Sequence, residues 1–469
     1  MKNTNKQSIK ADVTLGKQRG YNEVIEFLDA NWATNPADKS LSCIKKLDTA
    51  FGNLSQKINT IFVGGTNGKS LTINFATKLL QAEGLQVGAF SSPHILIYNE
   101  RFTLNSETIS NKAFTDIAND VINTAQAEGL TPNSYEILTI MALLYFKANN
   151  VDVALIEVNN HPATALFAPK ISAITRVTLE NEAPASEETE LYIKGLLATA
   201  TKDTHVVSAD QSKLNLQIML DMVQKKGANW DMPIRKLAPL IYPFEQLHGR
   251  CAALAERIAY IYVNFFANKD AVVVADTILT KQKGRRGRPT LEAKRQSELN
   301  PKKTVEQFWK DSQSMLQNRF QLLEKEKPTL LLDNANNLDA FKNLLLGIRL
   351  LHYQRPLIGL TLLISCNNNT TDLTEFLKLL RYFFKKTSGT IVLCPVKPLP
   401  GHDDNAAWDI EKVINDTKSM KIKAKACATF KEAFETSCKS VDERHGLVVV
   451  TGSPAIIAEY WKYKGVKKF

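Results

Sequence analysis

The sequence has few of the features that mark secreted, zinc-bound or membrane-embedded proteins. Its six cysteines, spread over 469 residues, form no C-x-x-C pair, which argues against a zinc site and against a disulfide scaffold. No stretch approaches the roughly 20 unbroken apolar residues that a membrane helix needs. Residues 1–20 are polar and basic without an apolar core. We therefore expect no secretory signal, no membrane association and a cytoplasmic location.

The most specific pattern in the chain is a phosphate-binding loop. Residues 64–70 read Gly-Gly-Thr-Asn-Gly-Lys-Ser, between an apolar run that ends at Val63 and a helical pattern that begins at Leu71. Glycines let backbone N–H groups turn toward phosphate oxygens, Lys69 adds a positive charge, and Ser70 can face a magnesium ion. Val63 replaces the first glycine of the general G-x-x-x-x-G-K-[ST] pattern, so a plain glycine turn is the alternative. The order of strand, turn and helix favours binding of ATP and Mg²⁺.

Short β-branched runs alternate with amphipathic helical patterns, which predicts an α/β fold with parallel sheets covered on both faces. The predicted strands are residues 58–63, 87–90, 153–157, 171–174, 205–208, 328–333, 357–364, 390–394, 421–427 and 447–451, and the predicted helices include 69–83, 112–128, 134–149, 188–200 and 249–267. Because open α/β sheets bind ligands beyond the carboxyl ends of their strands, we expect Ser70, Ser92 and Glu157 at one rim. Glu157 ends an apolar strand, where a carboxylate is costly unless it meets a cation. A capping or salt-bridged glutamate is the alternative.

Three further segments carry a resemblance to a known family. They are Ser91-Ser92-Pro93-His94, Asn99-Glu100-Arg101 and Val153-Ala154-Leu155-Ile156-Glu157-Val158. Together with Gly65-Thr66-Asn67-Gly68-Lys69, they resemble the folylpolyglutamate synthase and dihydrofolate synthase family, which belongs with the Mur ligases. The likeness covers roughly residues 20 to 160.

This resemblance implies an architecture and a reaction. It implies a Mur-ligase-like P-loop ATPase domain with a parallel-rich sheet, followed by a Rossmann-like C-terminal α/β domain, with the active site in the cleft between them. We assign residues 1–45 to a helical lead-in, 46–275 to the ATP-binding domain, 276–310 to a basic insertion and 311–469 to the C-terminal domain. The implied enzyme uses ATP to join L-glutamate to a folate- or pteroate-type carboxylate through an acyl phosphate. Its partners are then these small molecules, and we expect a monomer.

The resemblance also assigns residues to the site. Catalytic roles fall to Lys69 and Glu157, and magnesium ligation to Ser70, Ser92, Glu157 and Asn181. The nucleotide-binding residues are Gly65, Thr66, Asn67, Gly68, Lys69, Ser70, Arg319 and Asp333. The last two follow from Arg319-Phe320 and from residues 330–337, which resemble an arginine and an Asp-Gly-Ala-His-Asn segment of the family. For Asp333, a helix N-cap before residue 338 is the alternative.

Several departures from the family pattern fall on the chemistry. Residues 159–165 keep neither the glycines nor the aspartate of the family, and Glu180-Asn181 stands in place of Asp-His. Lys194 is about one residue out of register with the lysine that the family carbamylates to bind a second magnesium, and Asn336 replaces a histidine. An active ligase with an altered site is our first interpretation, and a nucleotide-binding pseudoenzyme that has lost ligation is the second.

A basic stretch leaves a third interpretation open. Residues 281–303 hold nine Lys or Arg against two Glu, a balance of +7 within a net charge of +11. Arg285-Arg286-Gly287-Arg288-Pro289 resembles the core of AT-hook peptides, which lie in the minor groove of A·T-rich DNA. A solvated interdomain insertion is the interpretation we favour, because charge runs are usually linkers or tails. We therefore expect no nucleic-acid partner.

Overall fold

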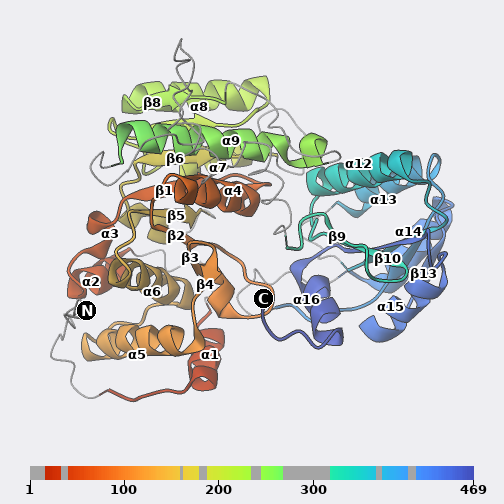
Figure 1. Ribbon diagram of the computed structural model, residues 1–469, viewed down its shortest axis with the longest axis horizontal. Helices are drawn as coiled ribbons and strands as arrows, with labels where there is room; N and C mark the ends of the chain where they lie inside the picture. The colour runs from red at the N-terminus through yellow and green to blue at the C-terminus, as the bar shows by residue number, and fades with distance from the viewer. Residues whose placement is uncertain are drawn as a thin grey trace, which may run out of the picture.

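The chain folds into two α/β domains, each built around one largely parallel sheet (Figure 1). The computed structural model describes residues 16–32, 41–158, 162–178, 187–233, 244–267, 317–365, 372–399 and 408–469. The basic stretch and the expected boundaries of the insertion at 276–310 lie outside these residues. No helix within the described ranges is long and apolar enough to cross a membrane. The predicted two-domain α/β fold is confirmed.

The N-terminal domain contains an eight-stranded sheet in the order β4-β3-β2-β5-β1-β6-β7-β8. The strands are β1 (Thr60–Gly64), β2 (Val87–Phe90), β3 (Phe102–Leu104), β4 (Glu107–Thr108), β5 (Val153–Glu157), β6 (Ile171–Ile174), β7 (His205–Ser208) and β8 (Asn229–Asp231). All neighbours are parallel except the β2–β3 and β3–β4 pairs. The central strands β1, β2, β5 and β6 are buried at every residue, as expected of parallel strands with both faces covered.

Helices cover both faces of this sheet. The helices with their bounds are α1 (Tyr21–Ala30), α2 (Ser42–Ala50), α3 (Leu54–Lys57), α4 (Lys69–Ala82), η1 (Tyr98–Arg101), α5 (Asn111–Ala127), α6 (Ser134–Ala148), η2 (Pro162–Leu166), α7 (Glu187–Leu196), α8 (Lys213–Lys226) and α9 (Phe244–Phe265). Helices α4 and α9 pack together over one face. The apolar sides of α1, α2, α5, α6, α7 and α8 join the core on the other face. The lead-in helices α1 and α2 are therefore part of the N-terminal domain core.

The C-terminal domain contains a six-stranded sheet in the order β13-β12-β11-β14-β10-β9. Its elements are β9 (Gln321–Leu323), β10 (Thr329–Leu332), α12 (Leu338–Gln354), β11 (Leu360–Ile364), α13 (Leu373–Phe384), β12 (Thr390–Leu393), α14 (Ile410–Ser419), β13 (Ala424–Ala426), α15 (Phe430–Lys439), β14 (Leu447–Thr451) and α16 (Pro454–Tyr463). Only the β9–β10 pair is antiparallel. Helices α12, α13 and α14 cover one face and α15 and α16 the other, which is the Rossmann-like arrangement expected.

Contacts between the domains bring the carboxyl edge of the first sheet toward the second domain. The first turns of α9 approach α12 (Figure 1), and Phe244 and Leu247 of α9 pack against the C-terminal core. Ile95, from the loop after β2, packs against the core beneath α15 and α16. The loops that follow β1, β2 and β5 therefore face the second domain.

The predicted strands at 87–90, 153–157, 171–174, 205–208 and 447–451 match the structure to the residue. The other five predicted strands differ from the structure at one or both ends, and two of them, 357–364 and 421–427, begin three residues too early because the chain turns there. Gly359 and Lys421 have φ values of +94° and +57°, which lie in the left-handed region that a strand cannot use. Strand β3 and the edge strands β4, β8 and β9 were not predicted, since two or three residues give no measurable alternation.

Candidate active site

The glycine loop between β1 and α4 has the geometry of a phosphate-binding turn. Gly65 and Gly68 have φ values of +124° and +91°, which side chains rarely adopt. A Cβ on Gly65 would lie 2.2 Å from Oγ1 of Thr175, and one on Gly68 would lie 2.8 Å from Sγ of Cys251. Only glycine fits at either position, because Thr175, just after β6, and Cys251 of α9 pack directly against the loop backbone.

Lys69, the first residue of α4, folds back over this loop. Its Nζ donates to the carbonyl oxygens of Gly65 at 2.9 Å and Thr66 at 3.3 Å, and lies 3.8 Å from Oε1 of Glu157. Burial lowers the pKa of Lys69, and the charge of Glu157 opposes that change. Burial likewise raises the pKa of Glu157, while Lys69 and Arg319 oppose the rise. The carboxylate at the end of β5 is thus buried in an ion pair with Lys69, which agrees with both interpretations of Glu157 given by the sequence.

Two serines contact Glu157, Ser70 through its hydroxyl and Ser92 through its backbone N–H. Oγ of Ser70 donates to Oε2 of Glu157 at 3.4 Å, and the backbone N–H of Ser92 donates to the same oxygen at 3.4 Å. One carboxylate and two hydroxyls suit Mg²⁺, which prefers oxygen and keeps several ligand positions for water and phosphate. In the part of the chain that the structure describes, no group of three or more His, Cys, Asp or Glu could hold a metal ion. Three of the four predicted metal ligands therefore meet, while Asn181 lies outside the described residues.

The loop after β2 is fixed from its inner side. Arg101 donates from Nη1 to Oγ of Ser92 at 2.8 Å and from Nε to Nδ1 of His94 at 2.9 Å. Its guanidinium is fully buried and lies 5.1 Å from the ring centre of Trp32 and 5.5 Å from that of Tyr98. The Asn99-Glu100-Arg101 triplet therefore has a structural role, because Arg101 orients the Ser92 hydroxyl.

Arg319 reaches the same cluster from the C-terminal domain. Its Nη2 donates to Oγ of Ser70 at 3.2 Å. Asp333 supports it, because its carboxylate accepts from the backbone N–H of Phe320 at 2.8 Å and of Ala335 at 2.9 Å. Burial raises the pKa of Asp333, and Arg319 and these two hydrogen bonds oppose the rise. The structure thus uses Asp333 to hold the turn that carries Arg319.

The helix-cap alternative for Asp333 is wrong. The N-cap of α12 is Asn337, whose Oδ1 accepts from the backbone N–H of Ala340 at 3.0 Å. Asn337 and Asp339 also hydrogen-bond the side chain of Asn67 in the phosphate loop. Sequence analysis missed both residues, since nothing local relates them to a loop some 270 positions away.

Helix α7 brings a tyrosine to the loop where the family pattern has a lysine nearby. Lys194 does not reach the site: its Nζ pairs with Glu190 at 2.6 Å and its side chain is 54% exposed. Tyr192 faces inward instead. Burial raises the pKa of its phenol to about 12, the charge of Glu157 adds to the rise, and a backbone hydrogen bond with Gly65 opposes it. Lys194 therefore differs from the family's lysine in its position in the structure as well as in its sequence register.

A buried histidine lies close to Arg319 but carries no charge at physiological pH. His248 of α9 is buried beside Arg319, and its Nδ1 has no hydrogen-bond partner among the described residues. Burial, reinforced by Arg319, lowers the pKa of His248 to about 4, so this histidine is neutral at physiological pH.

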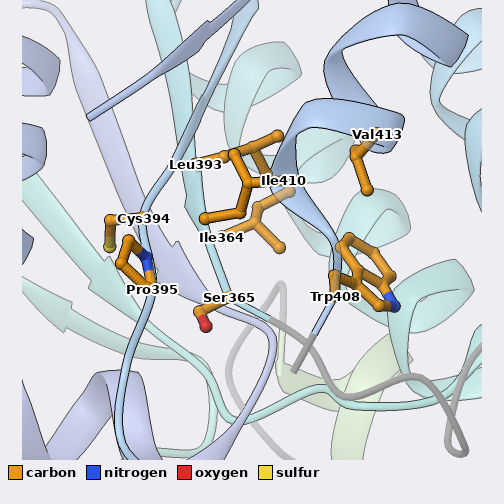
Figure 2. Close-up of a pocket in the computed structure, with 8 residues that line it drawn as sticks. All are labelled: Ile364, Ser365, Leu393, Cys394, Pro395, Trp408, Ile410 and Val413. Atoms are coloured by element: carbon orange, nitrogen blue, oxygen red, sulfur yellow. The ribbon is translucent and has the colours of Figure 1, made fainter. Parts of the chain in front are cut away.

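A hollow lies at the carboxyl ends of β11 and β12 (Figure 2). Its lining is Ile364, Ser365, Leu393, Cys394, Pro395, Trp408, Ile410 and Val413. It offers one side-chain hydroxyl and no charged side chain, so it lacks the groups that hold phosphates.

Part of the chain is similar in sequence to curated folylpolyglutamate synthases. No protein-family model matches the chain. A probable bifunctional folylpolyglutamate synthase/dihydropteroate synthase of Halobacterium salinarum is 38% identical over 125 residues, which are 25% of this chain and 15% of that protein. The dihydrofolate synthase/folylpolyglutamate synthase of Bacillus subtilis is 28% identical over 225 residues, which are 46% of this chain and 49% of that protein. The chain thus spans about half or less of these relatives.

Solved structures extend the likeness to both domains. Mycobacterium tuberculosis folylpolyglutamate synthase complexed with ADP matches with a TM-score of 0.71 at 18% identity, over 95% of this chain and 98% of that one. A bifunctional folylpolyglutamate synthase/dihydrofolate synthase with Mn, AMPPNP and L-glutamate bound matches with a TM-score of 0.69 at 17% identity, over 96% of this chain and 100% of that one. The chain is thus similar in sequence to folylpolyglutamate and dihydrofolate synthases over part of its length, and its two-domain fold is that of their solved structures.

Proposed function

We propose that the protein is an ATP-dependent ligase that joins L-glutamate to a folate- or pteroate-type carboxylate through an acyl phosphate. The observation that carries this proposal is the meeting of Lys69, Ser70 and Glu157 with Arg319 from the other domain. Cations and hydroxyls from two domains around one phosphate loop suit phosphoryl transfer, in which catalysis is mainly positioning and charge stabilisation. The relatives' names and the ligands of the structural neighbours support the same reaction class.

The phosphate loop is proposed to bind the nucleotide. Backbone N–H groups of residues 65–70 would hold phosphate oxygens at the start of α4, where the helix dipole favours anions. Lys69 would leave its carbonyl partners for the β and γ phosphates. Arg319, 3.2 Å from Ser70, would approach the transferred group from the opposite side and offset its growing charge.

Ser70, Ser92 and Glu157 would hold Mg²⁺, with Asn181 proposed as a further oxygen ligand. Bound magnesium supplies neutralisation of phosphate charge. The chain's own contribution is orientation, because Arg101 fixes the Ser92 hydroxyl and Ser70 bridges Glu157 to Arg319. A carboxylate that is only 3% exposed keeps water from competing for these positions.

A nucleotide-binding protein without ligation is the second candidate. It is favoured by one observation, the exposed Lys194 paired with Glu190, since a lysine directed at solvent cannot support a second metal ion. For either candidate we also propose a monomer located in the cytoplasm. One chain supplies residues from both domains to the site, and the cysteines that the structure describes are all free thiols.

The test incubates the purified protein with Mg-ATP, L-glutamate and either dihydropteroate or tetrahydrofolate, and detects the glutamylated product by mass spectrometry. Lys69→Ala should abolish product, whereas the matched surface variant Lys194→Ala should leave it unchanged. Absence of product with both acids, together with ATP binding that depends on Lys69, would support the second candidate instead.

A further inference from the structure

The tip of the phosphate loop is held by the other domain. Nδ2 of Asn67 donates to Oδ1 of Asn337 at 3.0 Å and to Oδ2 of Asp339 at 3.0 Å, while Oδ1 of Asn67 accepts from Nδ2 of Asn337 at 2.9 Å. A primary amide has two N–H donors and one oxygen. These contacts, which we call the interdomain clasp, therefore occupy both donors and the oxygen of Asn67.

The α12 side of the clasp is rigid. Asn337 is the N-cap of α12, and the same Oδ1 that accepts from Asn67 also accepts from the backbone N–H of Ala340 at 3.0 Å. Asp339 lies in the first turn, where the helix dipole favours a carboxylate. The apolar side of α12, including Phe341 and Ile348, is buried in the C-terminal core. The clasp therefore connects the loop to a fixed element of the second domain.

A second connection lies at the base of the loop. Arg319 donates to Ser70 Oγ across the same cleft, and its turn is fixed by Asp333. The four-residue stretch from Asn67 to Ser70 is thus anchored at both ends by the C-terminal domain. Since backbone N–H groups in this stretch are the phosphate ligands of such loops, the position of the second domain decides how they point.

We propose that Asn337 and Asp339 are positioning residues of the nucleotide site, which hold Asn67 so that the loop keeps its phosphate-binding shape only while the domains are closed. The inference rests on the proposed nucleotide binding and adds to it the residues that link affinity to closure. Asn67 then acts through its backbone and its clasp, because its side-chain amide is already occupied. Asp339 places a negative charge near an anion site, which opposes phosphate binding and is explained by its hydrogen bond to Asn67.

The first experiment needs no nucleotide. Asn337→Ser keeps a hydroxyl that caps α12, because serine and asparagine are comparable N-caps, but is too short to reach Asn67. Hydrogen exchange of the peptide covering residues 64–72 should become about tenfold faster in this variant, which corresponds to the loss of roughly one interaction. Asn133→Ser, at the N-cap of α6, is the matched control and should leave that peptide unchanged. Equal exchange in wild type and Asn337→Ser would overturn the clasp.

The second experiment measures the dissociation constant of Mg-AMPPNP by calorimetry. Asn337→Ser should weaken binding about tenfold, and Asn67→Ala at least as much, because Asn67→Ala also removes the hydrogen bond to Asp339. The double variant should bind no more weakly than Asn67→Ala alone, because Asn337→Ser then has no contact with Asn67 left to remove. Asp339→Asn keeps an acceptor and should bind within about threefold of wild type or more tightly, since only the charge is lost. A double variant about tenfold weaker than Asn67→Ala would mean independent roles and would refute the coupling. If wild type binds no Mg-AMPPNP, the proposed function fails, while the exchange experiment still decides whether the clasp exists.

Discussion

Removing Lys69 should destabilise the protein through the partner that it leaves behind. In Lys69→Met, the buried carboxylate of Glu157 loses a cation whose Nζ lies 3.8 Å away. At an effective dielectric constant of about 20, that attraction is worth about 4 kcal/mol. A second estimate gives the same figure: protonating a carboxyl with an ordinary pKa of 4.5 at pH 7.5 costs about 4 kcal/mol, and no larger penalty can build up. Because Arg319 still faces Glu157, we expect a loss of about 3 kcal/mol.

The pH dependence of this loss follows from the direction of the pKa change. Without Lys69, the pKa of Glu157 rises further above its ordinary value, so the folded state keeps a proton that the unfolded chain releases above about pH 4.5. The variant should therefore lose stability relative to wild type as pH rises from 5 to 7.5, and should approach wild type near pH 5. Urea unfolding in the presence of EDTA, followed by circular dichroism across this range, measures the difference.

Two further variants make the reasoning refutable. Lys69→Met combined with Glu157→Gln removes both charges and should recover to within about 1 kcal/mol of wild type, because a neutral pair leaves no buried ion. Lys194→Met breaks an ion pair in which both side chains are about half exposed and should change stability little at any pH. A double variant as unstable as the single one, or a loss that is constant from pH 5 to 7.5, would show that packing and not charge accounts for the effect.

Three other predictions concern the loop, the buried histidine and the buried arginine. Gly65→Ala combines a φ of +124° with a Cβ 2.2 Å from Thr175 Oγ1, so it should cost about 2 kcal/mol in urea unfolding and weaken Mg-AMPPNP binding by at least tenfold. His248 has a pKa of about 4 against an ordinary 6.5, so its contribution is complete above about pH 6.5 and is lost as pH falls toward 4. Wild type should then lose about 2 kcal/mol more than His248→Gln between pH 7 and pH 5, and equal losses would contradict the burial argument. Arg101→Met should lower stability by about 3 kcal/mol in thermal or urea unfolding and weaken Mn²⁺ binding measured by electron paramagnetic resonance. Ser92→Ala should weaken Mn²⁺ binding similarly at a smaller cost of about 1 kcal/mol in stability, and intact Mn²⁺ binding in Arg101→Met would refute the orienting role.

Much of the fold could be predicted because its signals are local. The strands β2, β5, β6, β7 and β14 match their predicted ranges since each is a short run built around adjacent apolar residues, and all their residues except His205 are buried. Such runs are typical of buried parallel strands. The strands β3, β4, β8 and β9 gave no such signal because each has only two or three residues. The predictions for β11 and β13 began too early because Gly359 and Lys421 are left-handed.

The candidate site divides in the same way. Lys69, Ser70, Ser92 and Glu157 were assigned from sequence and meet in the structure, because the carboxyl ends of parallel strands share one edge. The face that α7 turns toward the phosphate loop could not be predicted, since the periodicity of apolar residues fixes a helix face only to within about one residue. A shift of one position along α7 changes which side chain faces the loop, and in the structure Tyr192 faces the loop while Lys194 faces solvent.

The sequence by itself determined the phosphate loop, the alternation of strands and helices and the likeness to a family of ligases, because each depends on residues close together in the chain. Only the tertiary structure decided which groups control that loop. Asn337 and Asp339 reach Asn67, Arg319 reaches Ser70, and Arg101 fixes Ser92. These contacts form because the packing of the two domains brings residues far apart in the chain to within about 3 Å, the distance that a hydrogen bond requires. Spacing along the chain does not determine that distance.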